Sequence, residues 1–231
     1  MELYDRYLNG ETETVYAQLY ALGEKALTSE YFPQTELILI ETFRRAWFNL
    51  NEIYKELHAI NYQFVPNPAF DWQKPLTQPP ASTKQLIKKL QSKVSHIGHI
   101  PLSLQYFYRQ IGSCNFCWDY ETAPEIPWEG SDPIDIPPVN ELIEMIDEEF
   151  EEEEIFICGD ALHKDNISGA SYMLELTERP TVDSLLHGHD VSFIAYLRRT
   201  FNNCGFTLAD ECNYSELNAF REKVRPRLLV I

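Results

Sequence analysis

Residues 100–120 are IPLSLQYFYRQIGSCNFCWDY, a helix pattern and a strand pattern separated by a single glycine. Pro101 suits the start of the helix, because the first helical turn leaves its N–H groups unpaired. Apolar side chains then recur every three or four residues as far as Ile111, and Gly112 is a natural helix stop. The apolar run from Cys114 to Tyr120 predicts a short strand. This stretch predicts a protein that mixes helices with strands.

The sequence on both sides of this stretch continues the mixture. Helices are predicted at residues 83–93, 138–150 and 190–203, and strands at residues 134–136, 155–158 and 171–176. These elements are short and follow no βαβ repeat. The sequence therefore favours the α+β class.

The first 64 residues predict a helical extension made of two helices, from about Glu13 to Leu27 and from Thr35 to Ile60. In the second helix a stripe of apolar side chains is expected to face the core. Its members are Leu37, Ile40, Phe43, Trp47, Leu50, Tyr54 and Leu57. Residues 65–81 contain five prolines and predict an extended connector. The expected organisation is thus an extension at 1–64, a connector at 65–81 and an α+β domain at 82–231.

Four stretches after the connector resemble the SUKH superfamily, the SMI/KNR-like proteins that include suppressor of fused and many bacterial toxin-immunity proteins. The stretches are Ile100–Gly112, Asn115-Phe116, Asp132–Ile136, and Asn166–Ala170 with Tyr172. Members of the family often have Gly-Gly where this chain has Gly112-Ser113 and Gly169-Ala170. The N-terminal part also resembles the helical extension of one uncharacterised bacterial subgroup, through Leu8–Gly10, Val15-Tyr16, Leu22-Gly23 and Glu41–Arg45.

The resemblance implies a single SUKH-like α+β domain with a central, largely antiparallel or mixed sheet flanked by helices. It implies no catalytic machinery and no cofactor. It also implies a role in binding another protein, frequently a toxin that the cell must neutralise.

The chain carries 36 acidic and 19 basic residues, which gives a formal charge of −17. Such a field repels phosphate backbones and anionic bilayers within a screening length of about 8–10 Å. No run reaches the ~18 apolar residues of a membrane-spanning helix. We therefore expect neither a nucleic acid nor a membrane as a partner. Five cysteines, an odd number without a secretion signal, favour reduced thiols in the cytoplasm.

The acidic excess is concentrated at one place, where seven carboxylates follow a predicted helix. They are Asp147, Glu148, Glu149, Glu151, Glu152, Glu153 and Glu154. Carboxylates at the negative end of a helix dipole destabilise it, which suggests a use for them. One interpretation is a docking surface for a basic protein, such as a nuclease toxin. The other is a solvated loop that keeps the protein soluble.

A second candidate lies in the loop between two predicted strands, where polar side chains could form the rim of a pocket. These residues are Asp160, His163, Lys164, Asn166, Ser168 and Tyr172. An enzyme would use Cys117 or Ser168 as nucleophile with His163 as base, which makes a small hydrolase or thiol-dependent enzyme the alternative function. The same residue types also build turns through local hydrogen bonds.

Two short motifs are compatible with metal binding but lack the remaining ligands. Cys114 and Cys117 form a CxxC pair, which we interpret as thiols in or near a strand. His187-Gly-His189 has no accompanying carboxylate or cysteine cluster and is expected in a surface loop. We predict no metal.

These observations predict a non-enzymatic protein-binding module. Besides the enzyme, a second alternative is a regulatory scaffold that binds through its N-terminal helices. The sequence leaves the partner and the oligomeric state open.

Overall fold

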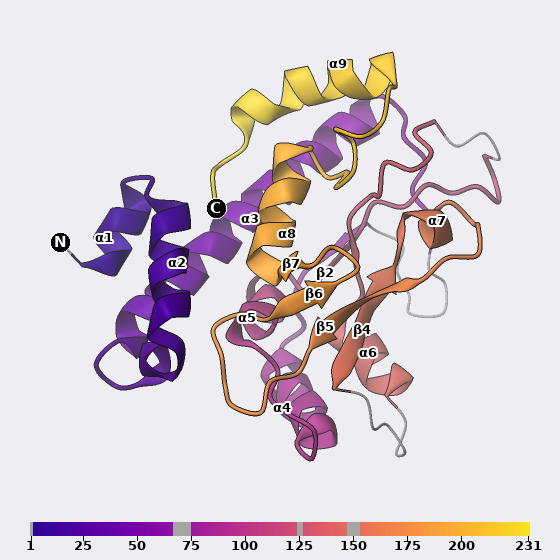
Figure 1. The fold of residues 1–231 in the computed structure, drawn as a ribbon. Helices are drawn as coiled ribbons and strands as arrows, with labels where there is room; N and C mark the ends of the chain where they lie inside the picture. The colour runs from indigo at the N-terminus through magenta and orange to yellow at the C-terminus, as the bar shows by residue number, and fades with distance from the viewer. Residues whose placement is uncertain (1, 67–74, 124–126, 147–152) are drawn as a thin grey trace.

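A computed structural model describes residues 2–66, 75–123, 127–146 and 153–231, and shows a mixed α+β fold (Figure 1). The N-terminal part is helical and consists of α1 (Leu3–Leu8), α2 (Thr12–Leu22), the 3-10 helix η1 (Gly23–Leu27) and α3 (Phe32–Ala59). The predicted helix at 13–27 is divided, because Gly23 has a φ of 53°. That conformation suits glycine and interrupts the α-helix.

Helix α3 buries most of the predicted stripe, including Phe43, Leu50 and Leu57, but leaves its first two members exposed. Leu37 and Ile40 are 41% and 37% exposed, whereas Ile38 and Leu39 are fully buried. The reason is that α3 packs against both α1 and α5, so its buried surface spans two sides of the helix. Trp47 and Tyr54 are partly buried and pack against the core.

The strands form two small antiparallel sheets. One sheet has the order β1 (Leu76–Thr77), β2 (Ser113–Asn115) and β3 (Asp135–Ile136); the other has β4 (Glu154–Gly159), β5 (Ser171–Glu175), β6 (Leu185–His187) and β7 (Val191–Ser192). Strands β3 and β4 lie against each other, so the two sheets are neighbours. The α+β fold class is confirmed, with the strands divided between two sheets.

Strand β2 is shorter than the predicted strand at 114–120. The side chain of Asn115 accepts a hydrogen bond of 2.8 Å from the backbone N–H of Cys117, two residues further on. Such a local turn removes the backbone from the ladder. The chain then rejoins the fold through an isolated bridge between Phe64 and Trp118.

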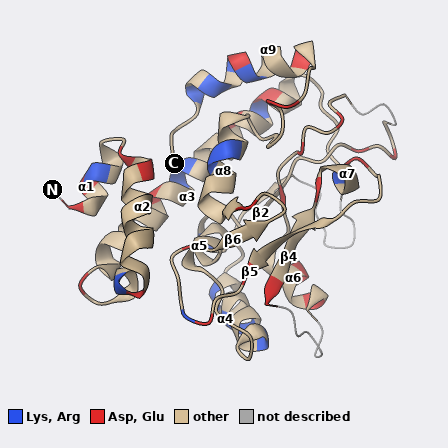
Figure 2. Cartoon of the chain, in the orientation of Figure 1, with Lys and Arg blue, Asp and Glu red and all other residues tan. Residues whose placement is uncertain are grey.

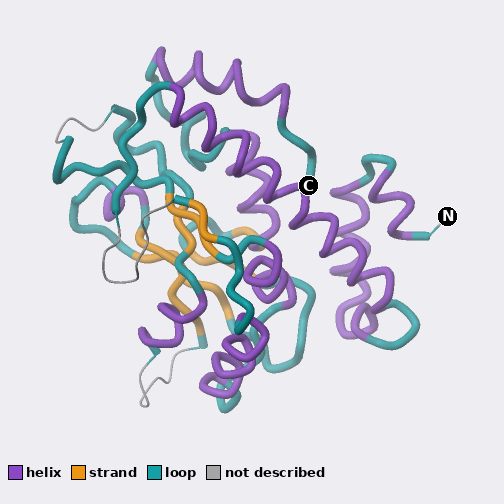
Figure 3. The backbone as a smooth tube through the Cα atoms, turned by 180° about the vertical axis from the view of Figure 1, so that it is seen from behind, coloured by secondary structure: helices purple, strands orange, loops and turns teal. Residues whose placement is uncertain are grey.

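The remaining helices surround the sheets (Figures 1 and 3). They are α4 (Thr83–Val94), α5 (Leu102–Gln110), α6 (Val139–Met145), α7 (Ala161–Lys164), α8 (Phe193–Asn202), α9 (Ser215–Val224) and the 3-10 helix η3 (Arg225–Arg227). Helices α4 and α5 agree with the predicted spans. The predicted helix at 138–150 is described only to Ile146, and its last four residues lie outside the described residues.

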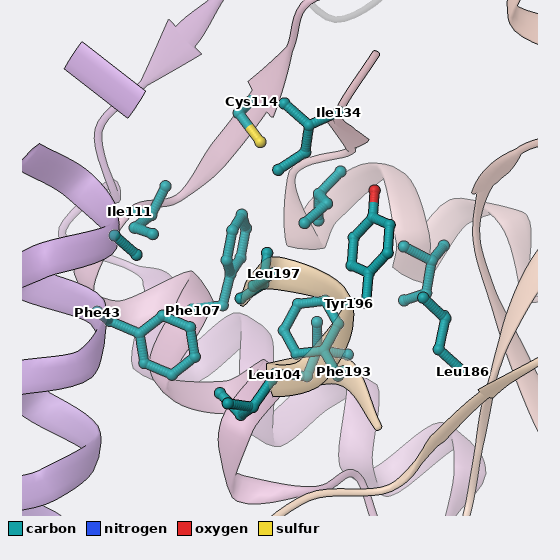
Figure 4. Packing of buried hydrophobic residues seen from close by; sticks show 14 of the residues in the cluster. Phe43, Leu104, Phe107, Ile111, Cys114, Ile134, Leu186, Phe193, Tyr196 and Leu197 are labelled. Atoms are coloured by element: carbon teal, nitrogen blue, oxygen red, sulfur yellow. The ribbon is translucent and has the colours of Figure 1, made fainter. Parts of the chain in front are cut away.

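A common hydrophobic core joins the N-terminal helices to the rest of the chain. Phe107 of α5 lies between Phe43 of α3 and Phe193 of α8, with ring centroids 6.2 and 5.9 Å away and edge-to-face geometry (Figure 4). Aromatic pairs at such distances and angles add stabilisation beyond their buried area. The extension is therefore anchored by α3.

Candidate functional site

The six residues predicted to form one rim are divided between the protein interior and its surface. Lys164 and Tyr172 are buried, whereas His163, Asn166 and Ser168 are exposed. Within the described residues no hydrogen bond joins His163 to Ser168 or to Cys117. The described part of the polar loop thus shows no hydrogen-bonded pair of nucleophile and base.

Asp160 has a structural role at the start of α7. Its Oδ1 accepts from the backbone N–H of His163 at 2.9 Å, and its Oδ2 accepts from the backbone N–H of Ala170 at 2.8 Å. A Cβ atom on Gly169 would clash with Asp160 Oδ1. These contacts agree with the turn-building interpretation, because one carboxylate caps the helix and closes the loop.

Lys164 points inward and forms an ion pair with Asp132, from the turn before β3. Its Nζ lies 2.6 Å from Asp132 Oδ1, and His189 Nε2 lies 3.2 Å from Asp132 Oδ2. The three side chains are at most 4% exposed. We call Asp132, Lys164 and His189, together with Tyr172 and Tyr196 beside them, the buried ion cluster.

Two tyrosines enclose the buried ion cluster. The ring centroid of Tyr172 lies 5.0 Å from Lys164 Nζ and 4.2 Å from the centroid of His189. The ring of Tyr196 lies 5.0 Å from His189 on the other side. A Cβ atom on Gly188 would clash with Tyr172, so the turn before His189 requires this glycine. The cluster connects α7, β5, α8 and the turns before β3 and β7.

The electrostatics of the buried ion cluster favour the charged forms of Asp132 and Lys164. Burial alone would raise the pKa of Asp132, but Lys164 and His189 outweigh burial and hold it below its usual value. Burial alone would lower the pKa of Lys164, but Asp132 outweighs it and holds it well above the usual range. Because Lys164 stays protonated, it is unsuited to act as a base or nucleophile.

The cysteines are free thiols. Burial raises the pKa of Cys117 well above its ordinary value and that of Cys158 to about 12. Since the thiolate is the reactive form, these side chains are poor nucleophiles. Cys114 is buried in the same way.

The two histidines of the His187-Gly-His189 motif have separate partners. His187 Nε2 lies 3.1 Å from Glu154 Oε1 at the surface, while His189 is in the buried ion cluster. The expectation of a surface loop is therefore wrong for the His189 side chain, because Asp132 and two aromatic rings surround it. In the described parts of the chain, no group of three or more His, Cys, Asp or Glu residues could hold a metal ion.

Most of the predicted acidic docking surface falls where the structure gives no description. Residues 147–152 lie outside the described residues, Glu153 is exposed, and Glu154 is half-buried beside His187. Figure 2 shows acidic residues around α6 and β4, and basic residues on α4, α8 and α9. Between Arg109 and Lys164 the chain has sixteen acidic residues and no lysine or arginine.

Two more carboxyl groups in this region have raised pKa values. Burial raises the pKa of Asp135 to about 6. Burial, Asp135 and Glu144 together raise the pKa of Glu141 to about 7. The charge of Lys164 opposes the rise in the pKa of Asp135 but does not outweigh burial.

The sequence contained one signal for the buried ion cluster that the sequence analysis did not use. Lys164 is the only lysine or arginine between Arg109 and Arg179. A lone cation in so acidic a region is a natural partner for a buried carboxylate. Its pairing with Asp132, 32 residues earlier, requires the fold.

Comparison with known proteins provides no relative: no family model, no curated protein and no solved structure matches the chain. The likeness to the SUKH superfamily stays a hypothesis based on the four stretches. Among the described helices, none combines the length and the apolar character needed to cross a membrane.

Proposed function

We propose that this chain is a non-enzymatic cytoplasmic binding protein whose acidic surface docks a basic protein partner. The observation that supports this is the pairing of Lys164. It is the only lysine or arginine between Arg109 and Arg179, and it is buried against Asp132. The surrounding carboxylates are therefore not offset by an exposed cation from their own segment.

An acidic surface favours fast, salt-sensitive association with a basic surface. Electrostatic steering of this kind raises association rates by roughly 10- to 1,000-fold. Proteins that act on nucleic acids are themselves basic, because their substrates are polyanions. With the SUKH resemblance, this favours an immunity-type role in which the chain covers a toxin such as a nuclease.

The chemistry of the other predicted site supports the same proposal over the enzyme. The thiols are buried with raised pKa values, and Asp160 holds a helix end and a loop. Turnover of a substrate by the pure protein, abolished by Cys117→Ser, Ser168→Ala or His163→Ala, would contradict the proposal.

The experiment is quantitative affinity purification from native cells with two matched variants. In the first, Glu151, Glu152, Glu153 and Glu154 are changed to lysine. In the second, four exposed glutamates elsewhere, Glu13, Glu30, Glu216 and Glu222, are changed to lysine. Both variants have the same net charge. We expect the wild type and the second variant to recover the same basic protein and the first to lose it; equal recovery by both variants would contradict the docking surface.

One observation favours a second candidate function, a scaffold that binds through its N-terminal helices. Leu37, Ile40 and Phe48 of α3 are 41%, 37% and 40% exposed. Leu37 and Ile40 lie on neighbouring turns, and Phe48 lies about two turns further along the helix. Changing all three to serine would remove a partner bound by this surface and would leave a partner of the acidic surface in place. The same purification distinguishes the two functions.

A further inference from the structure

A hollow of about 360 Å³ lies between α4 and α5, and its lining is rich in positive charge. The lining side chains are Lys84, Ile87, Lys88 and Gln91 of α4 and Gln105 and Arg109 of α5. On α4 they follow the spacing i, i+3, i+4 and i+7, and on α5 they are one turn apart, so each helix contributes one face. Figure 2 shows the basic residues along α4. Three cationic side chains thus border one hollow.

These three cations have no acidic partner within the described residues. None of the ion pairs there includes Lys84, Lys88 or Arg109. The guanidinium group of Arg109 is held by neutral groups instead. Its Cζ lies 4.9 Å from the centroid of the Tyr106 ring, and its Nη2 donates to Gln105 Oε1 over a long 3.4 Å. These contacts position the guanidinium group and leave most of its donors for an anion.

The sequence that forms the hollow is free of acidic residues. Between Asp71 and Asp119 the chain has six lysines and arginines and no aspartate or glutamate, although it carries 36 acidic residues in all. This stretch is the counterpart of the acidic stretch between Arg109 and Lys164. Its own segment therefore supplies no carboxylate that would compete with a ligand for the three cations.

The net charge of −17 does not exclude an anion at this place. The screening length is about 8 Å at physiological salt, so exposed carboxylates further away act on the hollow only weakly. An anion inside the hollow is attracted at short range by three cations. A nucleic acid or a membrane would also meet the acidic surface of the chain, so the net charge opposes those larger partners more than a small anion.

A phosphate monoester matches the hollow in charge, in acceptors and in size. Near pH 7 it carries roughly −1.5 to −2 charges and three acceptor oxygens. A guanidinium group binds two such oxygens at once, and lysine ammonium groups add point charges. Ile87 and the methylene chains of the lysines offer apolar surface to an organic group. The volume is at the small end of the roughly 300–1,000 Å³ of small-molecule sites.

We propose that the hollow between α4 and α5 is a binding site for a small phosphate monoester. The phosphate group binds to Lys84, Lys88 and Arg109, and the organic part lies against the aliphatic parts of the lining. The acidic docking surface plays no part in this site, which does not depend on the proposed function.

The test is calorimetric titration of the full chain with phenyl phosphate at about pH 7.5 and 50 mM salt. Benzenesulfonate has the same ring and three acceptor oxygens but a single charge, and phenol is neutral. We expect saturable 1:1 binding of phenyl phosphate, about two- to fivefold weaker binding of benzenesulfonate, and no binding of phenol. Raising the salt to 200 mM should weaken phenyl phosphate binding. Absence of saturable phenyl phosphate binding, or equal binding of phenol, would overturn the proposal. Tighter binding of a phosphoserine peptide would assign the hollow to a protein partner and overturn it as well.

Two neighbouring lysines provide a matched pair of variants. Lys88 and Lys89 are both exposed on α4, but only Lys88 lines the hollow. Lys88→Gln should bind phenyl phosphate about two- to fivefold more weakly, and Lys89→Gln, which has the same net charge, should bind it as the wild type does. Arg109→Gln should weaken binding about tenfold while cooperative thermal unfolding is retained. Equal loss in Lys88→Gln and Lys89→Gln would show that only the general charge matters and would overturn the site, as would unchanged binding in Lys88→Gln and Arg109→Gln.

Discussion

Asp132 and Asp183 are both buried, at 0% and 9% exposure, but their carboxyl groups have different partners. Asp132 lies between Lys164 and His189, and its pKa is lowered because these neighbours outweigh burial. Asp183 has only neutral donors, and burial raises its pKa although those donors oppose it. Burial alone does not set the direction of a pKa shift, because charged partners can outweigh it.

The difference extends to what each region can do. The buried ion cluster is enclosed by Tyr172 and Tyr196, and in it Asp132 lies 2.6 Å from Lys164 and 3.2 Å from His189. The carboxyl group of Asp183 instead accepts hydrogen bonds from Ser103, Tyr20 and the backbone N–H of Ile194. The first arrangement pairs opposite charges, while the second holds one carboxyl group with neutral donors.

The largest expected effect comes from removing the cation of the buried ion cluster. Lys164→Met leaves Asp132 buried without a full countercharge and should lower the free energy of unfolding by about 3–5 kcal/mol. Urea denaturation at pH 7 measures this. The double variant Asp132→Asn/Lys164→Met should recover most of the loss, because neither charge remains. A loss below about 1 kcal/mol in the single variant would remove the distinction between the two aspartates.

Asp183→Asn should cost less, about 1–3 kcal/mol, because an amide N–H₂ replaces one acceptor oxygen and leaves a buried donor unpaired. The exposed Asp190→Asn serves as control and should stay within about 0.5 kcal/mol of wild type.

Asp132 and Asp183 also predict opposite effects of pH on stability. The raised pKa of Asp183 makes its contribution to stability fall as the pH rises above about 4, and Asp183→Asn abolishes that slope. The lowered pKa of Asp132 makes its contribution fall as the pH drops below about 4. The pH dependence of the melting temperature in Asp183→Asn and in Asp132→Asn/Lys164→Met, each compared with wild type, checks both signs.

Asp135 provides a smaller effect of the Asp183 kind. Its pKa is about 6 in the folded protein and about 3.9 in an unfolded chain. Between these values the folded protein retains a proton that the unfolded chain has released, so stability falls as the pH rises. Asp135→Asn should therefore raise the free energy of unfolding by about 1–2 kcal/mol at pH 8 and give no gain at pH 4. The same gain in Glu144→Gln, an exposed acid nearby, would show that only the general negative charge matters.

The sequence predicted best those elements whose pattern is local. The helix at residues 102–110 has a proline start, one apolar stripe and a glycine end, and it forms as α5. The strands at 155–158 and 171–176 are short apolar runs bounded by polar loops, and they pair as β4 and β5. Local signals of this kind agree with the tertiary structure.

The rest depended on contacts that the sequence pattern does not contain. Steps of three and four describe more than one face of α3, and packing against α1 and α5 selected a face that leaves Leu37 exposed. The six rim residues were assigned to one site because they are close in sequence. The fold instead divides them between the interior and the surface, and pairs Lys164 with Asp132, and Tyr20 with Asp183, across 32 and 163 residues.

The salt dependence of the association rate tests the proposed function most directly. The basic protein recovered from native cells would be mixed with the chain in a stopped-flow instrument at 50 and 200 mM salt. The proposal predicts fast association that slows steeply with salt, and a slower rate with little salt dependence after charge reversal at residues 151–154. A rate that charge reversal leaves unchanged at both salt concentrations would contradict it.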